Sequence, residues 1–139
     1  MRKGTTLIEV SVTIGILGVM AGLTFPRFTS YRDRIAVDAA TSSTLSLLAT
    51  ARHAALRLAT HTTVHFDTAG AIVVVVAGVD TIERRPLRDI HGVGLATTRD
   101  SIAFGPGGLG YGAANTLIIL RRGAAADTVA VSRLGRARR

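Results

Sequence analysis

The chain has 139 residues, no cysteine and a formal net charge of +8 at neutral pH. The lack of cysteine excludes a disulfide scaffold and a cysteine-ligated zinc site. The length allows one domain beyond a membrane anchor. The positive excess lies at the end of the chain, because residues 121–139 hold six arginines and one aspartate, a net of +5.

The chain begins with a short basic segment that is followed by a long apolar run. Two basic residues precede Gly4, Glu9 is the only carboxylate of the run, and no further charge occurs before Arg27. Residues 7–25 would form about 28 Å of helix, which is enough to cross the hydrocarbon core of a bilayer. Basic residues before such a run favour a cytoplasmic N-terminus, so we expect the rest of the chain to face outward.

Two ordinary explanations of this segment are a signal peptide and a plain anchor helix. A signal peptide needs a small-residue cleavage site after the apolar run, and residues 23–27 (LTFPR) are a poor one. A plain anchor explains the apolar run but not Glu9, since a charge within a membrane segment is costly and marks a candidate functional site.

Residues 4–9 (GTTLIE) resemble the processing motif of type IV prepilins and of the pseudopilins of type II secretion. In those proteins a prepilin peptidase cuts after the glycine, the new first residue is N-methylated, and a glutamate is the fifth mature residue. The resemblance implies cleavage after Gly4, methylation of Thr5 and a role for Glu9 in subunit assembly. Thr5 departs from the usual phenylalanine or methionine.

The physical chemistry of the segment is compatible with that resemblance. Cleavage would create a new amine at Thr5, and the Glu9 carboxylate of one subunit could pair with the amine of its neighbour. Such a pair would offset the desolvation of the carboxylate and fix the axial stagger of the subunits. Gly18 and Gly22 form a GxxxG pattern, which is typical of close helix packing but also of membrane helices in general.

The apolar helix is expected to continue past Pro26 into a stem that ends near Leu58, because residues 31–59 contain neither proline nor glycine. Apolar positions recur there at steps of three and four residues, interrupted by one arginine, and this face should pack on the following domain. The stripe consists of Leu45, Leu48, Arg52, Ala55 and Ala59.

Short extended runs follow the stem and predict an antiparallel β region. The expected strands are residues 62–66, 71–77, 81–87, 94–97, 101–104, 116–120 and 128–132. The predicted fold class is therefore α+β, a long N-terminal helix packed on a C-terminal antiparallel β domain. The expected domains are a cleaved leader (1–4), a transmembrane helix (5–26), a helical stem (27–60) and a β-rich periplasmic domain with a basic tail (61–139).

Four later segments extend the resemblance: ARHAALRLATHTTVHF, SIAFGPGGLG, TLIIL and TVAVSRLGRARR. They resemble the H-type minor pseudopilins of type II secretion and the FimT-type minor pilins, which share a domain. This resemblance implies a single-pass protein of the bacterial inner membrane with its C-terminal domain in the periplasm. The implied partners are the prepilin peptidase and other pseudopilin or pilin subunits, with secreted protein substrates and DNA as further candidates.

No pattern in the chain predicts catalysis, a cofactor or a metal. Residues 105–110 (GPGGLG) match GxGxxG, but a strand is expected after them rather than the helix that a dinucleotide site requires. His61 and His65 would lie about 13 Å apart on an extended segment, which is too far to share an ion. We therefore expect no enzyme activity and no bound cofactor or metal.

The chain ends with Arg133, Arg136, Arg138 and Arg139. This tail is read as a solvated terminus, as a DNA contact, or as a contact with acidic faces of other subunits or anionic lipid headgroups. Four arginines on duplex DNA would give a salt slope of about −3.6. The tail contains no aromatic residue, so base stacking on the tail is not expected.

The resemblance implies a minor pseudopilin of a type II secretion system, processed by prepilin peptidase and assembled into a periplasmic pseudopilus. The alternative is a FimT-like type IV minor pilin that binds DNA during uptake. A third hypothesis is an anchored periplasmic domain that never polymerises.

Overall fold

The structure, a computed structural model, describes residues 6–112 and 115–139. The first element is α1 (Leu7–Leu58), an uninterrupted helix of 52 residues. It continues through Pro26 and ends at Leu58, as the sequence predicts. The chain divides into two compact units, residues 1–32 and residues 33–139, and every strand that the structure describes lies in the second.

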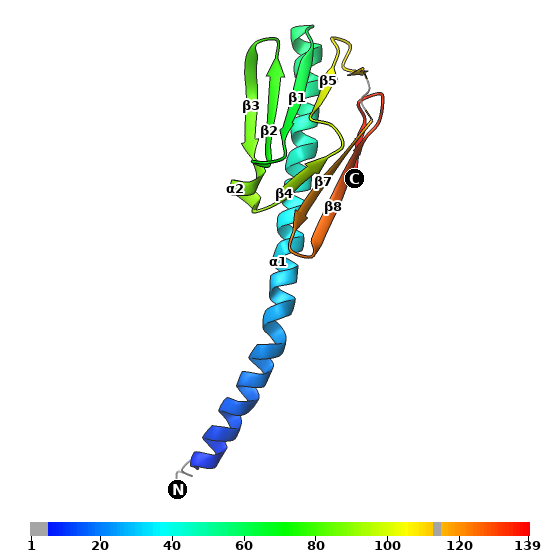
Figure 1. Ribbon diagram of the computed structural model, residues 1–139. Helices are drawn as coiled ribbons and strands as arrows, with labels where there is room; N and C mark the ends of the chain where they lie inside the picture. Colours follow the sequence, from blue (N-terminus) through cyan, green and yellow to red (C-terminus); the bar gives the residue numbers. More distant parts are fainter. Residues whose placement is uncertain (1–5, 113–114) are drawn as a thin grey trace. The chain divides into compact units, whose positions relative to one another are not determined.

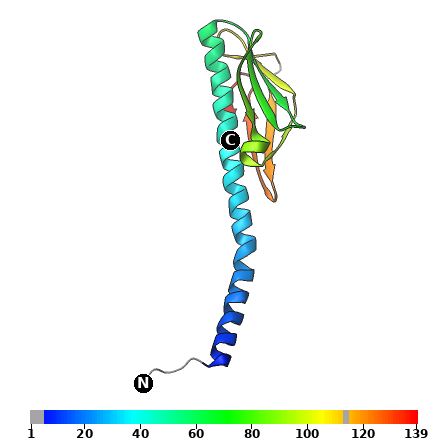
Figure 2. The same ribbon diagram turned by 90° about the vertical axis from the view of Figure 1, so that its left-hand side faces the viewer.

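The second unit carries two antiparallel sheets, shown beside the C-terminal part of α1 in Figures 1 and 2. The first sheet has the order β3-β2-β1-β5-β6. Its strands are β1 (Thr62–Asp67), β2 (Ile72–Ala77), β3 (Asp80–Pro86), β5 (Ser101–Phe104) and β6 (Gly110–Tyr111). The second sheet has the order β4-β7-β8-β9. Its strands are β4 (Gly94–Thr97), β7 (Thr116–Arg122), β8 (Ala125–Val131) and β9 (Ala137–Arg138).

The core lies between the stem part of α1 and the inner faces of both sheets. Alternate residues of the strands are buried, as the two-residue period of a strand requires. The stem buries many small side chains, which allow the strands to approach the helix closely. Its buried residues are Val37, Ala40, Thr41, Thr44, Leu47, Leu48, Ala51, Ala54 and Ala55.

The buried face of the stem differs in part from the predicted stripe. Leu48 and Ala55 are buried and Leu45 packs against the core, as expected. Ala59 is exposed, however, because α1 ends one residue earlier and Ala59 takes a positive φ of 48°. The face that packs on the sheets begins further toward the N-terminus than the stripe did.

A short helix was not predicted from the sequence. Residues 81–87 were expected to form one strand, but β3 ends at Pro86 and α2 (Leu87–His91) follows. The Leu87 side chain is fully buried, and its backbone N–H donates to the Ala71 carbonyl at 2.9 Å. This buried anchor ends the strand, and Gly92 closes α2 with a φ of 67°.

The glycine-rich segment 105–110 is a turn between β5 and β6 rather than the start of a helix. Two backbone hydrogen bonds close it, from Gly105 N–H to the Leu109 carbonyl and from Gly108 N–H to the Gly105 carbonyl. Gly108 has a φ of 70° and lies against the Leu56 side chain, so the turn requires glycine at this position.

Candidate functional site

Glu9 lies in the first turn of α1 and forms a reciprocal cap with Thr6. The Glu9 carboxylate accepts from the Thr6 N–H at 3.2 Å and from the Thr6 hydroxyl at 3.3 Å. In return the Glu9 N–H donates to Oγ1 of Thr6 at 3.3 Å. This T-x-x-E arrangement is a capping box, which satisfies helix N–H groups that would otherwise lack partners.

The capping box gives Glu9 a local role that sequence reasoning missed, although the T-x-x-E spacing was visible. It does not conflict with an assembly role, because the carboxylate is exposed and a carboxylate accepts several hydrogen bonds. Gly4 and Thr5, the predicted cleavage and methylation site, lie outside the described residues.

The apolar part of α1 is exposed along its whole described length. Every residue from Thr6 to Gly22 is exposed, and Leu7 reaches 88%. The hydroxyl groups of Ser11 and Thr13 are satisfied within the helix, since Ser11 donates to the Leu7 carbonyl and Thr13 to the Glu9 carbonyl. The helix is long and apolar enough to cross a membrane.

The three glycines of this apolar segment form a bare stretch of helix surface. No atom other than the helix's own neighbouring backbone lies within 4 Å of a side chain built at Gly15, Gly18 or Gly22. Bare backbone of this kind allows a second helix to approach closely. The surface is therefore available to a neighbouring helix.

The arginine-rich tail is folded rather than a loose terminus. β9 pairs with β8, and the connecting turn is closed by Ser132 N–H to the Arg136 carbonyl and Gly135 N–H to the Ser132 carbonyl, both at 2.8 Å. Gly135 has a φ of 76°, and a side chain there would collide with the buried ring of Phe104. The turn is thus fixed against the core.

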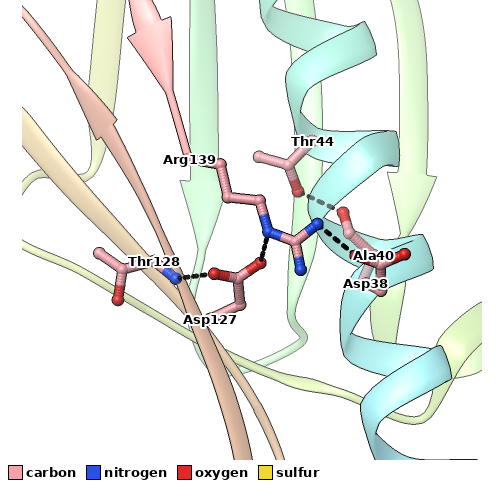
Figure 3. A network of polar contacts seen from close by, with 6 residues as sticks. All are labelled: Asp38, Ala40, Thr44, Asp127, Thr128 and Arg139. Carbon is pink, nitrogen blue, oxygen red and sulfur yellow. Dashed lines mark hydrogen bonds and ion pairs between the residues drawn. The ribbon is translucent and has the colours of Figure 1, made fainter.

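Arg139, the last residue of the chain, joins β8 to the stem (Figure 3). Its Nε lies 2.6 Å from Oδ2 of Asp127, and its guanidinium also forms an ion pair with Asp38 of α1. The other oxygen of Asp127 accepts from the Thr128 N–H at 2.8 Å. The hydrogen bond to Asp38 raises the pKa of Arg139, partial burial opposes this rise, and Asp127 adds to it.

Arg122 makes a second tertiary link. Its Nε donates to Oδ1 of Asp33 at 3.0 Å, and its Nη1 donates to the backbone carbonyl of His91 at 2.6 Å. These contacts connect the end of β7 with the stem and with α2. Arg122 belongs to the C-terminal basic excess, and the sequence did not indicate that it has a structural partner.

The structure does not bring the four tail arginines together as one cluster. Arg139 is held by carboxylates. Arg136 and Arg138 line one groove with the stem, and Arg133 lines another hollow with Arg99 and Tyr111. Within the described ranges, the side chains of Arg133, Arg136 and Arg138 have no ion pair. Three of the four therefore remain available to an anionic partner.

The histidines are placed separately. The ring of His61 meets that of Tyr111 edge-on, with 4.8 Å between centroids. His91 lies near Ser43 (Nε2 to Oγ, 3.2 Å), and burial followed by the positive charge of Arg85 lowers its pKa below the ordinary 6.5. In the part of the chain that the structure describes, no group of three or more His, Asp or Glu side chains could hold a metal.

Comparisons with known proteins give a match in structure alone. No family model matches the chain, and no curated protein matches it. Two crystal forms of the type IV minor pilin FimU from Pseudomonas aeruginosa PAO1 are similar to it. One has a TM-score of 0.63 and 12% identity, over 76% of this chain and 88% of FimU. The other has a TM-score of 0.59 and 10% identity, over 73% and 90%.

At these identities the likeness establishes the fold. The chain has the fold of these type IV pilin structures, a long N-terminal helix packed on antiparallel sheets.

Proposed function

We propose that this protein is a minor pseudopilin of a type II secretion system, a subunit that acts by assembly and carries out no chemistry. In this proposal the prepilin peptidase cuts after Gly4, Thr5 is N-methylated, and the apolar part of α1 anchors the subunit in the bacterial inner membrane. The domain of residues 33–139 then lies in the periplasm, where it meets other subunits and secreted protein substrates.

The observation that carries the proposal is the exposed apolar helix with a carboxylate in its first turn, on a chain with the type IV pilin fold. An isolated soluble protein rarely leaves so large an apolar surface uncovered. Lipid and neighbouring helices would cover it. The Glu9 carboxylate would then be offset by the amine of a neighbouring subunit's Thr5.

The capping box allows the charge of Glu9 to be separated from its local hydrogen bonds. Glutamine caps a helix as glutamate does, so Glu9→Gln keeps the helix start and removes only the charge. Thr6→Ala weakens the cap and keeps the charge. We expect Glu9→Gln to abolish incorporation into filaments in the native bacterium, measured by cross-linking to neighbouring subunits, and Thr6→Ala to retain it.

The opposite ranking would show that Glu9 acts as a cap and would remove the assembly argument. Mass spectrometry of the mature protein tests processing in the same cells. We expect a methylated Thr5 at the N-terminus. An uncut Met1 would favour an anchored domain that never polymerises.

The second candidate is a type IV minor pilin that binds DNA during uptake. Two observations favour it: Arg133, Arg136 and Arg138 have no ion pair in the described ranges, and the compared structures are those of a type IV minor pilin. With Arg139 engaged, three arginines remain, so the salt slope on duplex DNA should be about −2.7 rather than the −3.6 of four contacts.

Deletion of the gene separates the two machines. Loss of protein secretion with normal DNA uptake supports the pseudopilin. Loss of uptake with normal secretion supports the DNA-binding pilin.

A further inference from the structure

A groove runs between the stem and the end of the chain, entirely within the unit of residues 33–139. It has a volume of about 750 Å³. The stem contributes Leu45, Leu48, Arg52 and Leu56, and the tail contributes Arg136 and Arg138. The groove therefore combines an apolar floor with three guanidinium groups.

The charge of the groove is of one sign. No Asp or Glu among the described residues lines the groove. Its three arginines form no ion pair with any described carboxylate: Arg52, Arg136 and Arg138. Asp38 and Asp127 are already bound to Arg139. Arg136 and Arg138 also line a second hollow of about 360 Å³, together with residues of β8. An anionic partner would find uncompensated positive charge here.

The floor and the edge of the groove favour an extended polypeptide. Leu56 remains 48% exposed at one end of the floor. β9 is the last strand of its sheet. The Ser132 N–H donates to the Arg136 carbonyl, so the backbone of Arg136 faces β8. Successive residues of a strand turn their N–H and C=O groups to opposite edges, so those of Ala137 face the open edge, where an incoming strand can pair with them.

We propose that this groove binds an extended acidic segment of a partner protein. Carboxylates of the segment pair with Arg52 and with the arginines of β9, while its aliphatic side chains cover the stem leucines. Duplex DNA fits less well, because phosphates cannot cover an apolar floor and the only aromatic ring that lines the groove is the small imidazole of His53. This inference goes beyond the proposed function. It requires the folded domain of residues 33–139, and it holds whether the subunit serves a secretion system or a pilus.

The test uses the full chain in nanodiscs of zwitterionic lipid and a short fluorescent peptide that alternates Asp and Leu. Fluorescence anisotropy should show salt-sensitive binding. Arg138→Gln and Arg52→Gln should each weaken it about tenfold or more, the usual effect of losing a charged hydrogen bond. Arg133 is an exposed tail arginine outside the groove, so Arg133→Gln is the matched control. Its affinity for the peptide should stay within about twofold of that of the unaltered chain.

Two control ligands separate the contributions. A peptide with Ser in place of Asp should not bind, and one with Ser in place of Leu should bind more weakly. Arg138 is exposed, so its replacement leaves the core intact and the result interpretable even if Arg52→Gln unfolds. Equal affinity of Arg138→Gln and the unaltered chain would overturn the proposal. So would a short DNA duplex that binds more tightly than the peptide with the same dependence on Arg138.

Discussion

Replacement of Arg122 by alanine tests whether part of the C-terminal basic excess serves the fold. The change removes the hydrogen bonds to Asp33 (3.0 Å) and to the His91 carbonyl (2.6 Å). A hydrogen bond to a charged group contributes about 1.5–3 kcal/mol when shielded from water. The Arg122 and Asp33 side chains are 32% and 23% exposed, which reduces each bond to about 1 kcal/mol. We expect a loss of about 2 kcal/mol in the free energy of unfolding.

The assay is thermal unfolding of the full chain in mild detergent, followed by circular dichroism. A loss of this size should lower Tm by roughly 10 °C. Arg121→Ala is the matched control, because Arg121 is exposed and forms no ion pair in the described residues, and it should change stability by less than about 0.5 kcal/mol. The Tm of Arg122→Lys should lie between those of Arg122→Ala and the unaltered chain, since an ammonium group cannot make both contacts in the planar geometry of guanidinium. Equal Tm values for Arg122→Ala and Arg121→Ala would refute the reasoning.

Two further predictions concern the core and the pH dependence of stability. Leu120→Ala should lower the free energy of unfolding by about 3 kcal/mol, because Leu120 is fully buried. Leu117 on the same strand is 45% exposed, so Leu117→Ala should lower it by less than about 1 kcal/mol. Urea denaturation measures both. The pKa of His91 is lowered from 6.5 in the fold, so the unfolded chain takes up the proton first as the pH falls. The urea midpoint should therefore be highest above pH 6.5 and decrease below it. The midpoint of His91→Asn should decrease less over the same range. Parallel pH profiles of the two midpoints would exclude this role of His91.

The sequence predicted the fold class and most elements because their signals are local. The apolar run and the proline-free stem predict α1 to Leu58, and the β-branched run at 71–77 predicts β2. α2 was not predicted because a buried contact of Leu87 with the backbone at Ala71 decides it, and a local pattern cannot show such a contact.

The candidate site was predictable only where it depends on neighbours in sequence. Glu9 was selected as a carboxylate in an apolar run, and its cap by Thr6 follows from a spacing that was present but not used. The four tail arginines looked equivalent. Their separation depends on long-range partners, above all the pairing of Arg139 with Asp38 and Asp127.

The order of the elements along the chain affects when the domain can fold. Stem residues such as Leu47 and Ala51 are synthesised early, but β7 and β8, which help to cover them, are completed only near the C-terminus. The ion pairs of Arg139 with Asp38 and Asp127 can form only after β8 and β9 have been synthesised. The stem therefore leaves the ribosome with its inner face uncovered, and this face is buried only when the strands that follow it are in place.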